Sequence, residues 1–148
     1  MNHTAAIPAV IVRRTYPVSR ERLYEAWTTP EIAQKFLGGG NITCKVQKMD
    51  VRVGGTYEFL MKNTEFGDIE VVGIYSEVIP NEKLVMTWRW KEDDPKDEFD
   101  THLTLEFNDV AGGSEVVLTH FGFASQQSRD NHESGWSDIL DEAKTFLN

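Results

Sequence analysis

The stretch NHESGWSDILDEAKTFLN, residues 131–148, predicts a helix that has to be covered by the rest of the chain. At about 100° per residue, its apolar side chains fall within about 120° of a helical wheel, so one face must be buried. The same face, continued backwards, reaches His132 and, at its edge, Gly135. A glycine inside a helix costs roughly 0.5–1 kcal/mol relative to alanine, so its position beside a buried face requires a reason. The apolar members of the face are Trp136, Ile139, Leu140, Ala143, Phe146 and Leu147.

The segment from residue 41 to residue 123 alternates between apolar and polar side chains. Alternation with a period of two, sustained over several segments, indicates an antiparallel sheet with one buried face. A further strand, rich in β-branched residues, is expected before it at 8–19. The later strands are expected at 42–51, at 52–63 with a turn at Gly54-Gly55, and at 68–80, 83–92, 101–109 and 114–123.

Two short helices are expected between the first strand and the others. Ser19 is a suitable N-cap for a helix over 20–29, and Pro30 begins a second helix over 30–37 that the glycines at 38–40 end. The C-terminal helix is expected to start near Ser125–Ser128. The order β-α-α-β6-α predicts an α+β fold, with a curved antiparallel sheet of about seven strands around the long C-terminal helix. Residues 1–148 are expected to form one domain.

A curled sheet around one long helix commonly leaves space between them, and we expect a ligand cavity there. Small-molecule sites are mostly apolar, with a few convergent polar groups. His132 and Gly135 would then lie where helix and sheet part and the cavity begins. The side chains expected to line it are Tyr57, Phe59, Met61, Met86, Trp88, Trp90, Leu103, Leu105, Phe107, Leu118, His120, His132, Trp136, Ile139 and Ala143.

The histidines are the candidates for chemistry. His120 and His132 could act as an acid–base pair, because histidine changes charge near neutral pH. Neither is paired in the sequence with a nucleophile or a buried carboxylate, so structural roles are favoured and no catalytic residue is assigned. His3 and His102 are too scattered relative to the other two to suggest metal ligation, so neither metal nor cofactor is predicted.

The charge of the chain limits its partners. It carries 24 acidic and 15 basic residues, a formal net charge of −9, which argues against nucleic acid and anionic membranes. The acidic run EDDPKDEFD at 92–100 is interpreted as a solvated hairpin between two strands. The alternative is that it docks a basic partner surface.

The expected location is the cytoplasm. Cys44 is the single cysteine, so no intramolecular disulfide can form, which fits a reducing compartment. No apolar run approaches the roughly 18 residues of a membrane span. The apolar start AAIPAVIV lacks a preceding basic region and contains Pro8, which makes it a poor signal peptide.

Several segments, in their order and spacing, resemble the START-like helix-grip superfamily (also called SRPBCC or birch-allergen-like). Within it, the chain is most similar to the activator of heat-shock protein 90 ATPase homologue family. The resemblance covers almost the full chain. The segments that carry it are RTYPVSRERLYEAWTTPEIAQKFLG at 14–38, DVRVGGTYEF at 50–59, GIYSEVIPNEKLVMTW at 73–88, HLTLEFND at 102–109, GGSEVVLTHFGF at 112–123 and HESGWSDILDEAKTFL at 132–147.

The resemblance implies three functions. The first is a non-enzymatic module that binds a hydrophobic small molecule, as relatives in the superfamily do. The second is a co-chaperone-like module that binds a chaperone or another protein. The third is an enzyme of the polyketide-cyclase or hydrolase type, with His120 or His132 as the base. The eukaryotic activator has a further N-terminal domain, whereas a chain of this length resembles the small, mostly bacterial members, whose role is generally unassigned.

Overall fold

The computed structural model describes residues 6–39, 42–63, 65 and 67–148. His3 and Gly40, which entered the sequence-based expectations, lie outside these residues. The strands are β1 Val10–Tyr16, β2 Thr43–Met49, β3 Thr56–Asn63, β4 Gly67–Ile79, β5 Lys83–Trp90, β6 Thr101–Val110 and β7 Gly113–Phe121. The helices are α1 Arg20–Thr28, α2 Pro30–Phe36 and α3 Gln126–Glu142, with short 3₁₀ turns at η1 Pro95–Asp97 and η2 Ala143–Thr145.

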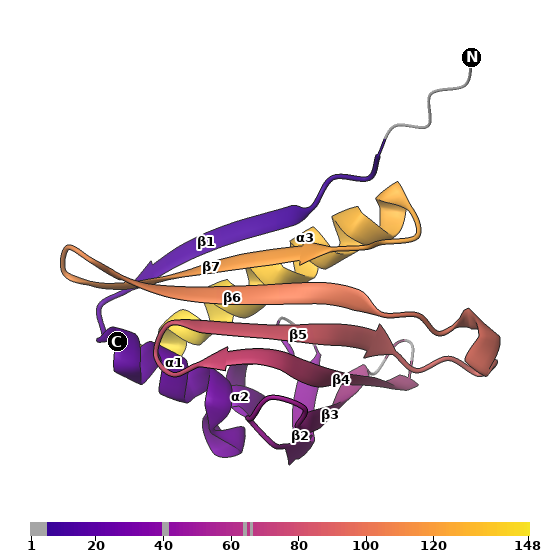
Figure 1. Ribbon diagram of the computed structural model, residues 1–148, viewed down its shortest axis with the longest axis horizontal. Helices are drawn as coiled ribbons and strands as arrows, with labels where there is room; N and C mark the ends of the chain where they lie inside the picture. Colours follow the sequence, from indigo (N-terminus) through magenta and orange to yellow (C-terminus); the bar gives the residue numbers. More distant parts are fainter. Residues whose placement is uncertain (1–5, 40–41, 64, 66) are drawn as a thin grey trace.

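The seven strands form one curved antiparallel sheet, which confirms the predicted fold class and element order (Figure 1). The spatial order is β1-β7-β6-β5-β4-β3-β2, so every strand from β2 to β7 lies beside its neighbour in sequence. The first strand instead pairs with the last, from Val10 opposite His120 to Tyr16 opposite Ser114. Two register shifts, at Val46/Lys48 and Tyr75/Glu77, interrupt the β2–β3 and β4–β5 ladders.

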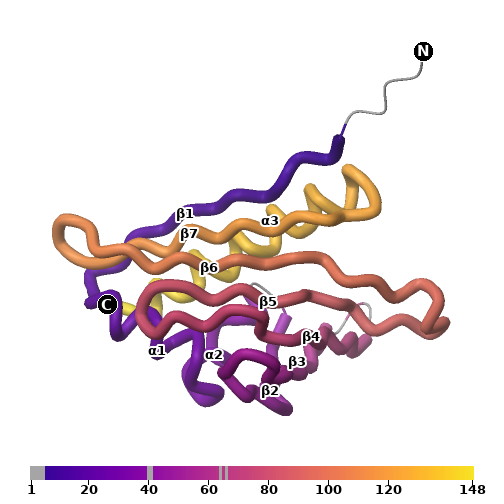
Figure 2. Tube along the Cα trace, viewed as in Figure 1, coloured from indigo at the N-terminus to yellow at the C-terminus, as the bar shows by residue number. Residues whose placement is uncertain are grey.

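The long helix α3 is fixed to the β1 side of the sheet. The Tyr16 hydroxyl donates a hydrogen bond of 2.7 Å to the Leu140 carbonyl oxygen, and Arg14 Nε lies 2.8 Å from Asp141 Oδ1. The helix also contacts α2. Figure 2 shows its C-terminal end close to α1 and its N-terminal end far from it. These contacts, together with the hydrogen bond of 3.2 Å from Arg129 Nη2 to the Ala9 carbonyl oxygen, hold α3 along β1, while His132 and Trp136 contact side chains of β5.

The end of α3 differs from the sequence-based expectation. The amphipathic stripe predicted a helix to the end of the chain, but the α-helix ends at Glu142 and continues as the 3₁₀ turn η2. The tighter turn changes the direction of the side chains, so that Leu147 is buried and Phe146 is half-buried. Apolar periodicity alone cannot distinguish a last 3₁₀ turn from a last α-helical turn.

The start of α3 is capped by Ser125, whose Oγ accepts a hydrogen bond of 3.0 Å from the Ser128 backbone N–H. We expect Ser125→Ala to lower the free energy of unfolding by about 1 kcal/mol, because one N–H of the first turn loses its acceptor. Urea unfolding followed by tryptophan fluorescence measures this change. A Ser125→Asp variant, which restores an acceptor, should recover most of it, and equal losses in both variants would contradict the capping role.

One continuous core fills the space between the sheet and the helices. The inward face of β5 contributes Leu84, Met86 and Trp88, and that of β6 contributes Leu103 and Leu105, all buried. Trp136, Ile139 and Leu140 cover them from α3. This burial agrees with the alternation in the sequence and leaves the question of where the core is incompletely filled.

Candidate functional site

A pocket of about 230 Å³ lies between the middle of α3 and the strands β3, β4 and β5. It is on the side of the sheet away from β1, along which α3 is fixed. A further wall is formed by Leu37, Gly38 and Ile42, which lie between α2 and β2. The lining residues are Leu37, Gly38, Ile42, Met61, Asn63, Gly67, Ile69, Trp88, Trp90, Asn131, His132, Gly135, Trp136 and Ile139.

The lining of this pocket is mostly apolar. None of its described lining residues is Asp, Glu, Lys or Arg. The polar groups are the Asn63 and Asn131 amides, the His132 ring and the tryptophan indoles. An ion inside would lose its hydration without meeting an opposite charge, which is strongly unfavourable. The pocket therefore suits a neutral molecule.

Two glycines shape the walls of the pocket. Gly135 lies on the pocket side of α3, and a Cβ atom built there has no heavy atom within 4 Å. The absent side chain therefore leaves open space in the pocket rather than allowing a close helix contact. Gly39 has a φ of +67°, and a Cβ there would lie 3.0 Å from Ile139 Cγ1, so glycine lets the segment after α2 pack closely on α3.

His120 is the most buried polar group beside the pocket, with 0% exposure. The indole N–H can only donate, so the His120 Nδ1 accepts from Trp136 Nε1 at 2.9 Å. The ring then carries its proton on Nε2, which donates to Thr101 Oγ1 at 2.6 Å. The Thr101 hydroxyl donates in turn to the Trp88 carbonyl oxygen at 2.7 Å. Burial lowers the pKa of His120 to about 3, and the positive charge of a protonated His132 would contribute to this shift.

His132 has the opposite tautomer. Its Nδ1–H donates to the Ser128 carbonyl oxygen at 2.7 Å, and its Nε2 accepts from Trp90 Nε1 at 2.8 Å. Burial lowers its pKa, and the hydrogen bond to Ser128 partly opposes this effect. The two rings contact each other edge to face, with centroids 5.1 Å apart. Each histidine is thus neutral, and each accepts one indole N–H.

This arrangement does not provide an acid–base pair. A general base needs a nitrogen that can reach the substrate proton. Here both ring nitrogens of His120 and of His132 are engaged by protein groups, and neither ring touches a carboxylate in these contacts. The histidines instead fix the orientation of two large aromatic side chains at the pocket, Trp90 and Trp136.

The residues expected to line the cavity separate into two groups. Met61, Trp88, Trp90, His132, Trp136 and Ile139 line the pocket. The others are buried in the core around it, away from its lining: Tyr57, Phe59, Met86, Leu103, Leu105, Phe107, Leu118, His120 and Ala143. Alternation places both groups on one face of the sheet, but it does not indicate which part of that face is left uncovered.

Several lining residues were absent from that expectation. Leu37, Gly38 and Ile42 lie beside the glycine run that ends α2, which was interpreted only as a helix terminator. Gly67 and Ile69 lie at the start of β4, where DIEVV does not alternate clearly. The one available signal was Gly135, which was expected at the cavity mouth.

The structure contains no group of three or more His, Cys, Asp or Glu residues suited to hold a metal among its described residues. Cys44 is a free, buried thiol, and burial raises its pKa to about 12. It therefore lacks the thiolate character of a nucleophile or metal ligand.

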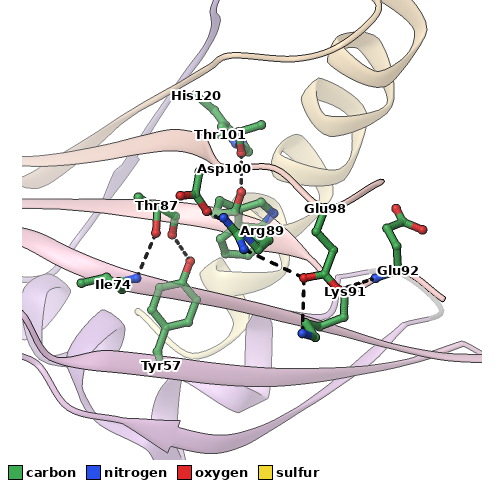
Figure 3. A network of polar contacts seen from close by, with 11 residues as sticks. Tyr57, Ile74, Thr87, Arg89, Lys91, Glu92, Glu98, Asp100, Thr101 and His120 are labelled. Carbon is green, nitrogen blue, oxygen red and sulfur yellow. Dashed lines mark hydrogen bonds and ion pairs between the residues drawn. The ribbon is translucent and has the colours of Figure 1, made fainter. Parts of the chain in front are cut away.

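The acidic run at 92–100 folds back on β5 (Figure 3). Glu98 accepts a hydrogen bond from the Glu92 backbone N–H at 3.2 Å and lies 3.3 Å from Lys91 Nζ. Asp100 binds Arg89 at 2.8 Å. The backbone contact at Glu92, followed by Lys91, holds the pKa of Glu98 below its ordinary value. Asp93, Asp94 and Asp97 are exposed, so part of the acidic charge remains available at the surface.

A family model described as "Activator of Hsp90 ATPase homolog 1-like protein" matches residues 17–148, which include α1, α2, six of the seven strands and the whole of α3. The chain belongs to this family. Its match begins just after β1 and includes every residue that lines the pocket.

The curated relatives of this family member include the human protein named activator of 90 kDa heat shock protein ATPase homolog 1. The two are 27% identical over 127 residues, which are 86% of this chain and 33% of the human protein. The mouse protein of the same name is 26% identical over the same length. The chain thus spans about a third of the length of these relatives.

Solved structures of bacterial proteins share the fold of this family member. A Chromobacterium violaceum protein has a TM-score of 0.85 at 25% identity, covering 94% of this chain and 96% of that one. The AHSA1 protein from Silicibacter pomeroyi has a TM-score of 0.84 at 20% identity, with coverages of 95% and 97%. Among the described residues, no helix is long and apolar enough to cross a membrane.

Proposed function

We propose that the protein is a non-enzymatic binding module that holds a small, neutral, hydrophobic molecule between α3 and the strands β3–β5. The observation that carries this proposal is the apolar pocket with open space at Gly135. A glycine at this position of the helix has a cost in stability. The space that its missing side chain leaves on an otherwise buried face supports the binding of a ligand. The pocket volume of about 230 Å³ exceeds the roughly 150 Å³ of an engineered apolar cavity that binds benzene.

Titration with α-methylstyrene, a neutral hydrocarbon with one ring, tests this function. Methyl NMR should show saturable shifts for Met61, Ile69 and Ile139, which line the pocket, and no comparable shifts for Leu84 and Leu105 in the filled core. Native mass spectrometry of the purified protein would complement it by revealing a copurifying molecule. Absence of saturable shifts up to the solubility limit of the probe would contradict a pocket that accepts hydrophobic molecules.

A co-chaperone-like function is the second candidate, and it is supported by the family and by the exposed acidic loop. The human relative is named for a 90 kDa heat shock protein ATPase, and a contact through Asp93, Asp94 and Asp97 would be electrostatic. A polyketide-cyclase-type enzyme is the least supported candidate, because all ring nitrogens of His120 and His132 are already engaged.

The acidic loop provides a test of the second function. Replacing Asp93, Asp94 and Asp97 by asparagine should weaken binding to a 90 kDa heat shock protein about 2- to 10-fold at low salt, if the loop is the contact. The effect should decrease as salt rises, because exposed charges are screened. Isothermal titration calorimetry at two ionic strengths measures both. Glu98 is left unchanged because it holds the loop in place.

The matched control removes the same charge elsewhere. Glutamines at Glu21, Glu31 and Glu142, which are exposed on the helices, give an equal net charge without altering the loop. Equal weakening in both variants would indicate a general charge effect and would count against docking by the loop. Binding of α-methylstyrene should be unchanged in both.

A further inference from the structure

Three tryptophans line the pocket, and two of their indole N–H groups have identified acceptors. Trp90 donates to His132 Nε2 at 2.8 Å, and Trp136 donates to His120 Nδ1 at 2.9 Å. The third indole, that of Trp88, is buried with 3% exposure, and its Nε1 has no hydrogen-bond partner among the described residues. A buried indole N–H usually has an acceptor, and a bound molecule can supply one because the Trp88 side chain borders the pocket.

Three acceptor atoms in the aromatic cluster already receive another donor. His120 and His132 each have one acceptor nitrogen, and Trp136 and Trp90 take these. The Thr101 oxygen receives the His120 Nε2–H. A water molecule in the pocket would need two to four polar partners, and the mostly apolar lining offers few. A bound molecule with its own acceptor can receive the Trp88 N–H, and no water molecule is then needed in apolar surroundings.

We propose that the natural ligand carries a neutral hydrogen-bond acceptor, a carbonyl or ether oxygen, which accepts the Trp88 indole N–H while its hydrocarbon part fills the space beside Gly135. The inference rests on the proposed ligand-binding function and narrows it to small cyclic or aromatic ketones, aldehydes and ethers. A carboxylate is disfavoured because none of the described lining residues is Lys or Arg.

Trp88 also lines a second cavity of about 180 Å³, together with Trp90, His132 and the acidic side chains Glu92 and Asp97. Its mixed lining can support a water molecule better than the main pocket can. The experiment therefore has to determine whether the indole N–H is free before a ligand is added.

The test compares two probes of nearly the same shape. Acetophenone has a carbonyl oxygen where α-methylstyrene has a CH₂ group. The indole N–H signals are followed by ¹⁵N NMR, with the Trp88 signal assigned from Trp88→Phe, and those of Trp90 and Trp136 serve as internal controls. Acetophenone should move the Trp88 N–H proton downfield, because the N–H then gains an acceptor. α-Methylstyrene should shift the pocket methyl groups without the downfield movement.

Affinity gives a second readout. In each variant, the dissociation constant of α-methylstyrene is divided by that of acetophenone. This ratio should be about 3- to 10-fold larger in wild type than in Trp88→Phe, because only the wild type has the indole N–H. The ratio of the two affinities within one variant cancels general effects of the substitution on packing. The NMR comparison uses wild type, so it stands even if Trp88→Phe folds poorly and the assignment has to come from triple-resonance spectra.

The outcomes separate this inference from the proposed function. If both probes shift the pocket methyls but affect the Trp88 N–H alike, the pocket binds hydrophobic molecules and the inference about the acceptor is wrong. A Trp88 N–H proton already downfield before any addition would also overturn it, since the group then has another acceptor. If neither probe shifts the pocket methyls, the proposed function itself fails.

Discussion

Gly135→Leu is expected to weaken α-methylstyrene binding about 10- to 100-fold while the fold remains intact. The Cβ position of Gly135 faces open space, so the leucine side chain can extend into the pocket and occupy the volume that the probe needs. Displacing it would force overpacking, which typically costs about 1–3 kcal/mol, and each 1.4 kcal/mol is about tenfold in affinity. Methyl NMR titration gives the dissociation constants.

Stability should change in the opposite direction. Glycine within a helix is about 0.5–1 kcal/mol less favourable than alanine, and leucine is almost as good a helix former as alanine. Gly135→Ala should therefore raise the free energy of unfolding by this amount with little effect on the probe, since one methyl group leaves most of the pocket open. Gly135→Leu should be at least as stable as wild type by urea unfolding.

Ser134→Leu is the control for placing a leucine on this helix, because Ser134 is adjacent but exposed. It should bind α-methylstyrene as wild type does. If Gly135→Leu binds the probe normally, the space at Gly135 is not where the probe lies. If Gly135→Leu unfolds more easily than wild type, the glycine is needed for packing rather than for open space.

The order of the elements could be predicted because the signals for it are local. Ser19 and Ser125 cap helices where the sequence indicates, and both caps form hydrogen bonds. The alternation in β5 and β6 correctly placed Trp88 and Leu103 on the buried face. The two register shifts, at Val46/Lys48 and Tyr75/Glu77, left this face intact in the strands that carry most of the core.

The position of the pocket depends on contacts that the sequence pattern does not contain. α3 could have covered any part of the inner face, and Tyr16 and Arg14 fix it to β1 through Leu140 and Asp141. This position of α3 leaves space over β3–β5. Residues such as Leu105 therefore lie in the filled core and not at the pocket. The strand order places β1 beside β7, which no local pattern specifies.

The roles of the histidines likewise follow from side-chain geometry. The sequence places His120 on the sheet face that carries Trp88 and Trp90, and His132 on the helix face that carries Trp136. It favours structural roles for both histidines. Which ring nitrogen accepts from which indole depends on side-chain rotamers. The sequence therefore predicted the membership of the cluster but neither its tautomers nor the unpaired N–H of Trp88.

Acidification from pH 7 to pH 5 is expected to lower the free energy of unfolding by about 2 kcal/mol through His120 alone. The pKa of this residue is lowered to about 3 in the folded protein, against about 6.5 in the unfolded chain. Between these values the unfolded state binds more protons, so stability is present above about pH 6.5 and is lost as the pH falls. His132, whose pKa is also lowered, acts in the same direction.

The range from pH 7 to pH 5 is chosen so that the histidines dominate the change in the free energy of unfolding. Asp141 and Glu98 have pKa values held below their ordinary values, so they remain ionised between pH 7 and pH 5. Urea unfolding at pH 7, 6 and 5, followed by the fluorescence of the buried tryptophans, gives the free energies. Most of the loss should appear below pH 6.5, where the unfolded chain takes up its proton.

His120→Gln should remove most of this pH dependence, because glutamine does not titrate. It should also lower stability at pH 7 by about 1–3 kcal/mol, since one of the two hydrogen bonds to Trp136 and Thr101 is lost or distorted. His102→Gln changes an exposed histidine whose charge is the smallest of the contributions to the low pKa of His120, so this variant should keep most of the wild-type dependence. A His120→Gln variant that still loses about 2 kcal/mol between pH 7 and pH 5 would show that another group carries the proton uptake, and that His120 is not held neutral by its two partners.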